Sequence, residues 1–441
     1  MATWKLPAEL ASWVALLARP LHARVAARLG PVLLGMLFAR GRRTVASWLR
    51  AAGVGAKFPS YYYFLGSLGR KVEWIAGVLL RLAVQVIAPG ERLLMAIDDT
   101  PTKRYGKKVQ GAGIHHNPTP GPADQQFLYG HIWVTLAWLV RHPLWHCLGL
   151  PLRALLYVRQ KDIAKLPRRT KVKFRTKLEM AAELIAWAAE RLRWLGKTLW
   201  VVVDGAYGKK PVLKKAKAQG VVIVSRLRKD ARLYDVPKPP RRRGPGRPRI
   251  YGEPISLAKR GAHPRGWQTG TFTLYGKMVS KLYKSFVATY PPAGGPIRVV
   301  IVREDDGWVA FFATDPNATV AQVLEAVADR GAIEQDFHDL KEVHGAGQQQ
   351  VRYYWANVAV YHLNLWLHTL IELWAWARPK AELCDRTQSP WDDPERRPSH
   401  ADRRNALRRS CLQREFSAVQ AEHRLSRKLR GLFTALLQLI V

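Results

Sequence analysis

The chain has 441 residues, enough for roughly two or three domains, and its 48% hydrophobic content is sufficient for a sizeable core. It carries 71 Lys and Arg residues against 33 Asp and Glu residues, a net charge of +38. Because such an excess destabilises a compact fold by self-repulsion, we expect a polyanionic partner. Nucleic acid is the first candidate, and an anionic membrane surface is the alternative.

The membrane alternative is disfavoured by the two most apolar stretches, residues 13–39 and 355–376. Arginines interrupt the first, and Asn, His and Glu interrupt the second, so neither offers the ~20 apolar residues of a spanning helix. The three cysteines, Cys147, Cys384 and Cys411, fit neither a zinc motif nor a disulfide framework. We therefore expect a cytoplasmic, nucleoid-associated protein with no membrane partner.

Residues 1–85 are predicted to form a helical domain, because apolar residues recur at helical spacing between positions 26 and 36. A short basic helix follows, with Arg42 and Arg43 before it and Gly53 after it. This pattern suits a helix-turn-helix arm that binds DNA. An ordinary helical bundle with a solvated basic face is the alternative.

Two apolar segments end in acidic residues. Residues 93–97 precede Asp98 and Asp99, and residues 199–203 precede Asp204. An acid at the carboxyl end of a buried strand lies at the sheet edge where ligands and metals bind in α/β folds. A single such Asp is commonly only a turn residue, but two of them in a strongly basic chain favour a metal site.

The stretch from Pro101 to Gly121 is rich in Gly and Pro and is predicted to be a loop. Its basic residues include Lys103 and Arg104, which are well placed to hold phosphates near the first acids. Two further strands are predicted at residues 127–140 and 144–156, where the sequence is apolar and β-prone.

A capping box at Thr176 and Glu179 predicts the start of a helix that ends near Gly196. The strand at 199–203, a helix at 211–219 and a strand at 221–224 follow. Strands followed by alternating helices and strands indicate an α/β fold with a mixed sheet. The order fits a ribonuclease H-like sheet, and residues 86–227 would form the first part of that core.

From residue 228 the alternation stops, and residues 228–315 are predicted to hold a basic arm and a β-rich insertion. The segment 246–249 resembles an AT-hook, an extended arm in the minor groove; a flexible basic linker is the alternative. Its candidate DNA-binding residues lie among prolines and glycines: Arg241, Arg242, Arg243, Arg247 and Arg249. Short β-prone runs then extend to residue 313.

Helical character returns at Thr319, and residues 316–378 would complete the core. Arg330, Glu334 and Lys341 fall on one stripe of a helix, since four and eleven residues are nearly whole turns. A surface salt-bridge ladder is the alternative explanation. Residues 379–441 are predicted to be a charged helical tail that ends in a short amphipathic helix at 425–440.

Assembled in this order, the residues resemble the DDE transposases of bacterial insertion sequences. The closest resemblance is to the group with a β-rich insertion before the catalytic glutamate and a Tyr-Arg-Glu-Lys signature. Arg330, Glu334 and Lys341 match that signature, whereas its tyrosine position is Val327. Asp98-Asp99-Thr100 is similar to the group's Asp-x-Thr, which favours Asp98 as the metal ligand and leaves Asp99 as the alternative.

The resemblance implies a metal-dependent enzyme that cuts DNA and transfers the cut strand. Asp98, Asp204 and Glu334 would be the catalytic residues and would hold two Mg²⁺ ions, with Mn²⁺ as a substitute. Arg330, Lys341 and Lys103 would contact phosphates. The implied partner is double-stranded DNA, both transposon ends and target, bound by a homodimer. The alternatives are a host ribonuclease H-like nuclease or resolvase, and a non-catalytic DNA-binding protein derived from a transposase.

Overall fold

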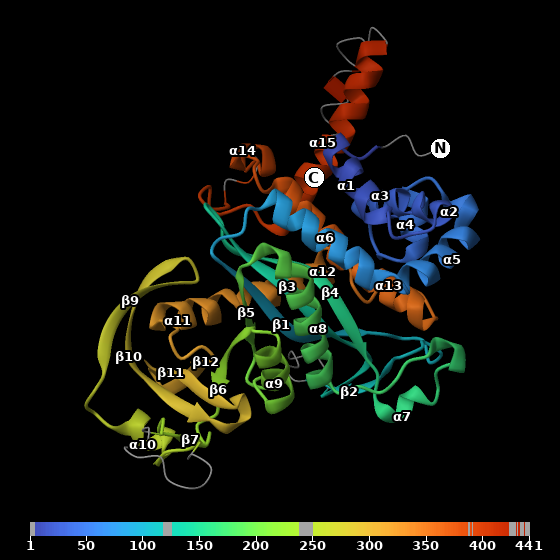
Figure 1. The fold of residues 1–441 in the computed structure, drawn as a ribbon. Coiled ribbons are helices and arrows are strands. Elements are labelled where there is room, and N and C mark those ends of the chain that lie inside the picture. The colour runs from blue at the N-terminus through green and yellow to red at the C-terminus, as the bar shows by residue number, and fades with distance from the viewer. Residues whose placement is uncertain are drawn as a thin grey trace.

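A computed structural model describes residues 5–117, 126–237, 250–386, 389, 391–422, 429, 431–432 and 436. The chain forms a group of helices, a large sheet with helices on both faces, and a curved β-rich lobe (Figure 1). The arginines predicted to lie in the basic arm, and most of the predicted helix at 425–440, fall outside the described residues.

The N-terminal part folds as helices, as its apolar spacing predicts. Two of these helices cross closely at Gly35 of α3, because a Cβ at that position would lie 2.1 Å from the carbonyl oxygen of Trp48. Trp48 and Leu49 are buried, so the short basic helix α4 packs firmly into the group. The helices are α1 (Ala8–Ala18), α2 (Ala23–Ala26), α3 (Leu29–Phe38), α4 (Val45–Ala51), η1 (Gly55–Lys57), α5 (Phe58–Gly69) and α6 (Val72–Val86).

Five strands form the centre of the sheet, in the order β4-β3-β1-β5-β6. β1 pairs antiparallel with β3 and parallel with β5, and β5 pairs parallel with β6. This mixed sheet confirms the predicted α/β, ribonuclease H-like fold. The strands are β1 (Arg92–Lys103), β3 (Phe127–His142), β4 (His146–Tyr157), β5 (Thr198–Val203) and β6 (Val222–Leu227).

The prediction of a loop from Pro101 to Gly121 is wrong in two segments. β1 continues to Lys103, which pairs with Gly130, and Gly113–His116 form the strand β2 beside β3. A Cβ at Gly130 would lie only 2.2 Å from the carbonyl oxygen of Thr102, so this glycine permits the close approach. The hydrogen bonds that hold these residues come from a distant strand, which local Gly and Pro content cannot reveal.

The β-rich insertion continues the same sheet, because β12 pairs antiparallel with β6. Asp305 and Asp306 form the tight turn between β11 and β12. The insertion contains β7 (Leu233–Tyr234), β8 (Pro254–Ile255), α10 (Leu257–Ala262), β9 (Gln268–Leu274), β10 (Lys277–Tyr290), η4 (Pro291–Ala293), β11 (Gly295–Glu304) and β12 (Gly307–Ala313).

The remaining helices cover the sheet or follow it. The predicted capping box opens α8, with both reciprocal hydrogen bonds between Thr176 and Glu179 present. These elements are α7 (Gln160–Ile163), η2 (Arg168–Thr170), α8 (Lys177–Leu192), η3 (Arg193–Leu195), α9 (Lys210–Ala218), α11 (Val320–Asp329), α12 (Gly331–Glu342), α13 (Tyr354–Ala375), α14 (Lys380–Leu383) and α15 (His400–Glu422).

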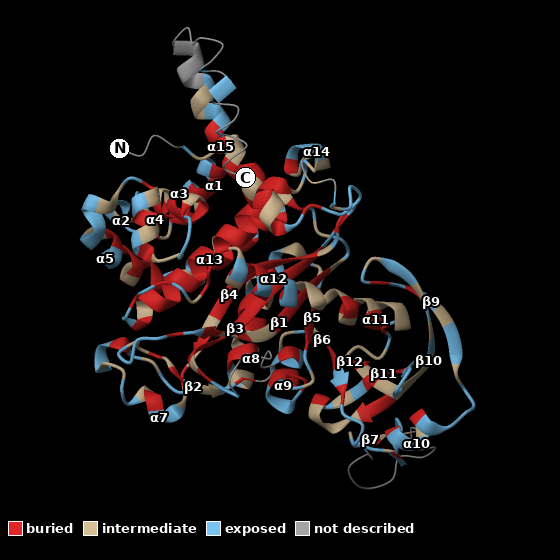
Figure 2. Cartoon of the chain, turned by 180° about the vertical axis from the view of Figure 1, so that it is seen from behind, coloured by how far each residue is buried: buried red, intermediate tan, exposed pale blue. Residues whose placement is uncertain are grey.

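Helix α13 is buried along almost its whole length, between the sheet and the N-terminal helices (Figure 2). It is fastened to β4 where that strand bulges. Trp366 Nε1 donates to the carbonyl oxygen of Leu152 at 3.0 Å, and the Thr369 hydroxyl donates to that of Pro151 at 2.7 Å. Buried backbone oxygens left unpaired by the bulge thereby find donors. None of the helices in the described part of the chain combines the length and apolar composition of a membrane-spanning segment.

The close contact between α5 and α13 generates a stability prediction. A Cβ at Gly69 would lie 1.9 Å from the carbonyl oxygen of Trp355, so Gly69→Ala must push the two helices apart. We expect it to destabilise the fold by about 1–3 kcal/mol. Gly66→Ala in the same helix is the matched control, because its nearest atom is 3.9 Å away at the end of the Arg70 side chain. Equal melting temperatures of the two variants in a thermal unfolding experiment would refute this packing account.

Candidate active site

The sheet brings the first two acids together. β1 and β5 run parallel with Ile97 opposite Val203, so Asp98 and Asp204 are the next pair along the two strands. β5 ends at Val203, and Asp204 is exposed in the turn that follows. Asp98 still lies within β1, with a side chain that is 20% exposed. The two carboxylates therefore lie next to each other on neighbouring strands, as expected for acids that follow paired parallel segments.

Arg330 connects the first acid to the third. Its Nη1 lies 2.7 Å from Asp98 Oδ2, and its Nη2 lies 2.6 Å from Glu334 Oε1. The Glu334 side chain is 57% exposed. A surface salt-bridge ladder would engage only Arg330 and Glu334, whereas here the same guanidinium also reaches a strand more than two hundred residues earlier in the chain.

The helix that carries these residues is not continuous, contrary to the expectation from the sequence. α11 ends at Asp329, Arg330 caps the junction, and α12 begins at Gly331. Arg330 donates its backbone N–H to the carbonyl of Ala326, so the backbone remains helical through the change of axis. The junction places the Arg330 side chain above β1 while α12 carries Glu334 and Lys341 onward.

Asp99 lies on the opposite side of β1 from Asp98, as neighbouring residues of a strand must. Its Oδ2 lies 2.6 Å from Lys177 Nζ at the start of α8, and its Oδ1 accepts a 2.5 Å hydrogen bond from the Tyr207 hydroxyl. Both oxygens of Asp99 are thus engaged by the protein. Asp98 also accepts two hydrogen bonds, from Arg330 and from the backbone N–H of Asp99. The two acids therefore differ in the side of β1 on which they lie and in their partners.

The surroundings of Asp98 disfavour the negatively charged form of its carboxyl group. Burial raises the pKa of Asp98 to about 6, and the neighbouring carboxylates of Asp99 and Asp204 act in the same direction. Arg330 and the backbone N–H of Asp99 oppose that rise. Burial, followed by the charge and the hydrogen bond of Asp99, raises the pKa of the Tyr207 hydroxyl far above its ordinary value. Such crowding of acids is typical of a site that receives a cation.

Two cations that the sequence singles out lie near each other at the far end of α12. Lys341 is partly buried, and its pKa is lowered mainly by burial and further by the charge of Lys103. Lys103 ends β1, five residues beyond Asp98. The pair therefore adds positive charge along the same strand and helix that carry Asp98 and Glu334.

Arg104 has a structural position that the sequence does not indicate. It is 6% exposed, its Nε donates to His131 Nδ1 at 3.1 Å, and its Nη1 donates to the carbonyl oxygens of Gly347 and Gln349. Its guanidinium is occupied in holding the loop after α12 against β1. We therefore do not retain Arg104 as a phosphate contact.

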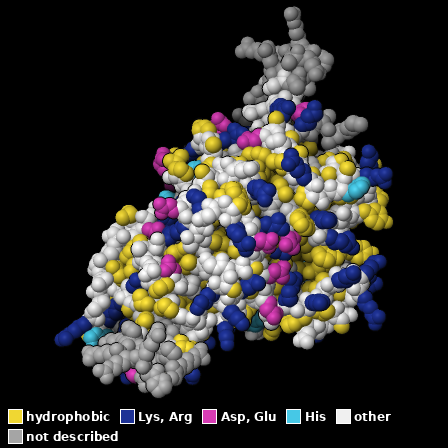
Figure 3. Space-filling model, viewed as in Figure 1, with side chains coloured by type: hydrophobic (Ala, Val, Ile, Leu, Met, Phe, Trp, Pro, Cys, Tyr) yellow, Lys and Arg dark blue, Asp and Glu magenta, His cyan; other side chains and the backbone are white. Residues whose placement is uncertain are grey.

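The basic segment before α4 lies against that same loop. Arg43 donates its backbone N–H to Gln348 Oε1 at 2.8 Å, and the Arg42 guanidinium stands over the exposed Tyr105 ring, 6.0 Å from its centre. Arg42 and Tyr105 line a pocket of about 340 Å³ between residues 104–109 and 347–352. Lys and Arg side chains are scattered over much of the described face seen in Figure 3.

Sequence reasoning did not anticipate Lys177 and Tyr207. Both act on Asp99 from separate elements, and only the pairing of β1 with β5 and the packing of α8 bring them there. The tyrosine of the signature is absent, and Val327, at its position, packs partly buried against the core.

Comparison with protein families matches residues 17–276 to the family described as DDE superfamily endonuclease. The matched range includes Asp98 and Asp204 and ends before Glu334. A comparison with curated proteins finds no match. The match covers more than half of the chain. The chain therefore belongs to the DDE superfamily endonuclease family.

Proposed function

We propose that the protein is a transposase that binds transposon ends and catalyses metal-dependent DNA cleavage and strand transfer. The observation that carries the proposal is the convergence of Asp98, Asp204 and Glu334. Asp98 and Asp204 come from two parallel strands, and Glu334 comes from a helix. Arg330 lies within hydrogen-bonding distance of both Asp98 and Glu334. Membership of an endonuclease family supports the cleavage step.

The donor set fits Mg²⁺, with Mn²⁺ as a substitute. Asp98, Asp204 and Glu334 supply only carboxylate oxygens, the ligands that Mg²⁺ prefers in phosphoryl-transfer sites. Asp99 would not join this set, because it lies on the opposite side of β1 from Asp98, where Lys177 and Tyr207 hold it. Two bound metal ions would activate the attacking water or 3′-hydroxyl and stabilise the leaving oxygen.

The protein's own cations would hold the substrate. Arg330 stands between Asp98 and Glu334 and limits their mutual repulsion. Lys341 lies on α12 with Glu334, and Lys103 lies on β1 with Asp98. Both cations would contact a phosphate next to the scissile bond. Arg42 and Arg43 would contact DNA from the N-terminal helices. The arginines at 241–243, 247 and 249 would bind DNA outside the active site, and the complex would be a homodimer.

Asp98→Asn and Asp204→Asn should abolish cleavage of a labelled transposon end in Mg²⁺, because each removes a metal ligand. DNA affinity should stay within about threefold of wild type, since the positive field persists. Asp99→Asn is the matched control and should retain measurable cleavage, because Asp99 faces away from Arg330.

Loss of cleavage in Asp99→Asn with activity retained in Asp98→Asn would reverse the assignment. Cleavage by the wild type without joining of the cut strand to target DNA would indicate a nuclease or resolvase instead of a transposase.

Mg²⁺ affinity should decrease as the pH is lowered, because the pKa of Asp98 is raised to about 6. A protonated carboxyl cannot bind the cation, so affinity should be nearly constant above pH 7. It should decrease roughly tenfold between pH 7 and pH 5, as expected for competition with one proton near pH 6. Calorimetric titration of the full chain at each pH measures this, and a flat profile over that range would contradict it.

Lys341→Ala should slow strand transfer by about ten- to a hundredfold on pre-cleaved ends without lowering Mg²⁺ affinity, because one phosphate contact is lost. Lys214→Ala, an exposed lysine of α9, removes the same charge away from the acids and serves as the control. If Lys341 only stabilises the helix surface, its loss should cost at most ~0.5 kcal/mol of stability and leave the kinetics unchanged.

A further inference from the structure

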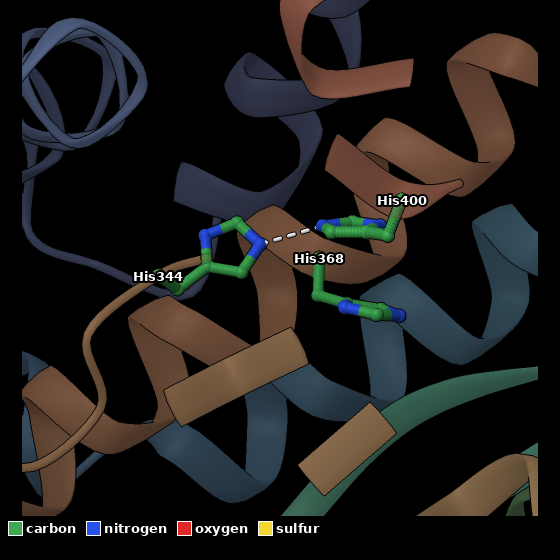
Figure 4. Close-up of side chains that lie close together, drawn as sticks. All are labelled: His344, His368 and His400. Carbon is green, nitrogen blue, oxygen red and sulfur yellow. Dashed lines mark hydrogen bonds between the residues drawn. The ribbon is translucent and has the colours of Figure 1, made fainter. Parts of the chain in front are cut away.

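Three buried histidines meet where the chain after α12 contacts α13 and α15. His344 follows α12, His368 lies in α13, and His400 begins α15. All three are at most 3% exposed, and one ring nitrogen of each lies within 4.8 Å of the others (Figure 4). Three segments that are distant in the sequence thus contribute one nitrogen donor each.

Two buried carboxylates stand behind this cluster. His400 Nδ1 lies 2.6 Å from Glu372 Oε1, and His368 Nε2 lies 3.3 Å from Asp336 Oδ1. A metal-binding histidine generally donates its second ring nitrogen to a carboxylate, which fixes the ring and makes the other nitrogen a better ligand. Here two of the three histidines have that arrangement.

His368 Nδ1 is a buried nitrogen that makes no hydrogen bond to any residue in the described part of the chain. A buried polar atom without a partner costs free energy, so it calls for an explanation. With its Nε2 held by Asp336, this nitrogen presents a lone pair that a cation can use.

A cavity of about 530 Å³ reaches the cluster and provides access. Asp336, His368, Glu372 and His400 line it, together with Arg403, whose Nε lies 2.9 Å from Glu372 Oε2. The two carboxylates would offset the charge of a divalent ion, and Arg403 already balances one of them.

We propose that His344, His368 and His400 bind a transition-metal ion of the Zn²⁺ type. Imidazole nitrogen suits Zn²⁺, whereas the carboxylates near Arg330 suit Mg²⁺. The two sites would therefore differ in ligand chemistry as well as in place. The bound ion would fasten α15 and α13 to the end of the helix that carries Glu334.

Metal binding requires a change in the present ring positions. His344 Nε2 and His400 Nε2 share a hydrogen bond of 2.7 Å, and the His368 ring stacks on that of His400 at 3.9 Å. Two nitrogens bound to one tetrahedral Zn²⁺ are roughly 3.3 Å apart, given Zn–N distances of about 2.0–2.1 Å. His344 would exchange its hydrogen bond for the metal, its proton moving to Nδ1, and the stacked rings would turn apart.

The test is titration of the full-length protein with Co²⁺ in excess Mg²⁺, which saturates carboxylate sites and leaves nitrogen sites free. We expect one equivalent of Co²⁺ to bind with the visible absorption of a nitrogen-ligated ion, and Zn²⁺ to displace it. His344→Asn, His368→Asn and His400→Asn should each abolish that absorption. His263→Asn, an exposed histidine of the insertion, is the control and should retain it.

A gentler variant guards against misfolding. Glu372→Gln keeps all three histidines and should weaken Co²⁺ binding about 10- to 100-fold, as expected when the carboxylate behind a ligand is lost. Circular dichroism of each variant without metal verifies the fold. Absence of the absorption in the wild type, or its persistence in all three histidine variants, would overturn the proposal and leave a buried hydrogen-bonded cluster. Neither outcome depends on DNA cleavage, so failure here is distinguishable from failure of the proposed function.

Discussion

The contact of Arg330 with both Asp98 and Glu334 is the interaction on which the rest of the site depends. Burial already raises the pKa of Asp98 to about 6, and the carboxylates of Asp99 and Asp204 add to the effect. Arg330 is the cation that holds Asp98 and Glu334 together, at 2.7 and 2.6 Å. The chain places it at the junction of α11 and α12, where both carboxylates are within reach of its guanidinium. Asp99, one residue from Asp98, is kept out of this arrangement by its own partners on the other side of β1.

The rest of the fold keeps that arrangement in place. α12 packs against β4 and β1. The side chains of α13 bond the carbonyls of the β4 bulge and so fix the same strand. α15 is tied in turn to the N-terminal helices, because Arg404 and Arg408 donate to the backbone carbonyls of Met36 and Leu37. The N-terminal helices and α15 thus both pack against α13. The histidine cluster lies where α13 and α15 meet the residues after α12. The β-rich insertion is continuous with the sheet through β6 and β12.

Sequence patterns predict the strands, the capping box at Thr176 and the mixed sheet, since each depends on local periodicity and turn chemistry. They also predict that Asp98 and Asp204 follow two apolar strand segments, and the pairing of β1 with β5 brings these residues side by side, although β1 continues past Asp98 to Lys103. Strand periodicity alone does not choose between Asp98 and Asp99. Their different partners, Arg330 for Asp98 and Lys177 and Tyr207 for Asp99, reach β1 only through tertiary packing. The sequence predicts that Arg104 contacts phosphate, because it lies close to the acids along the chain. In the fold its guanidinium is buried against the loop after α12, a contact that also depends on tertiary packing. The histidine cluster has no sequence signal, because its members are separated by long intervals and only the packing of three helices unites them.

The central claim is that a divalent cation sits among Asp98, Asp204 and Glu334 and not at Asp99. A crystal of the full-length protein with a transposon-end duplex, grown with Mn²⁺, tests this through the anomalous signal of the metal. The account predicts anomalous density within about 2.0–2.3 Å of carboxylate oxygens of Asp98 and Asp204, on the side of β1 that faces Arg330. Anomalous density on the Asp99 side between Lys177 and Tyr207, or none at all near Asp98 at saturating Mn²⁺, would contradict it.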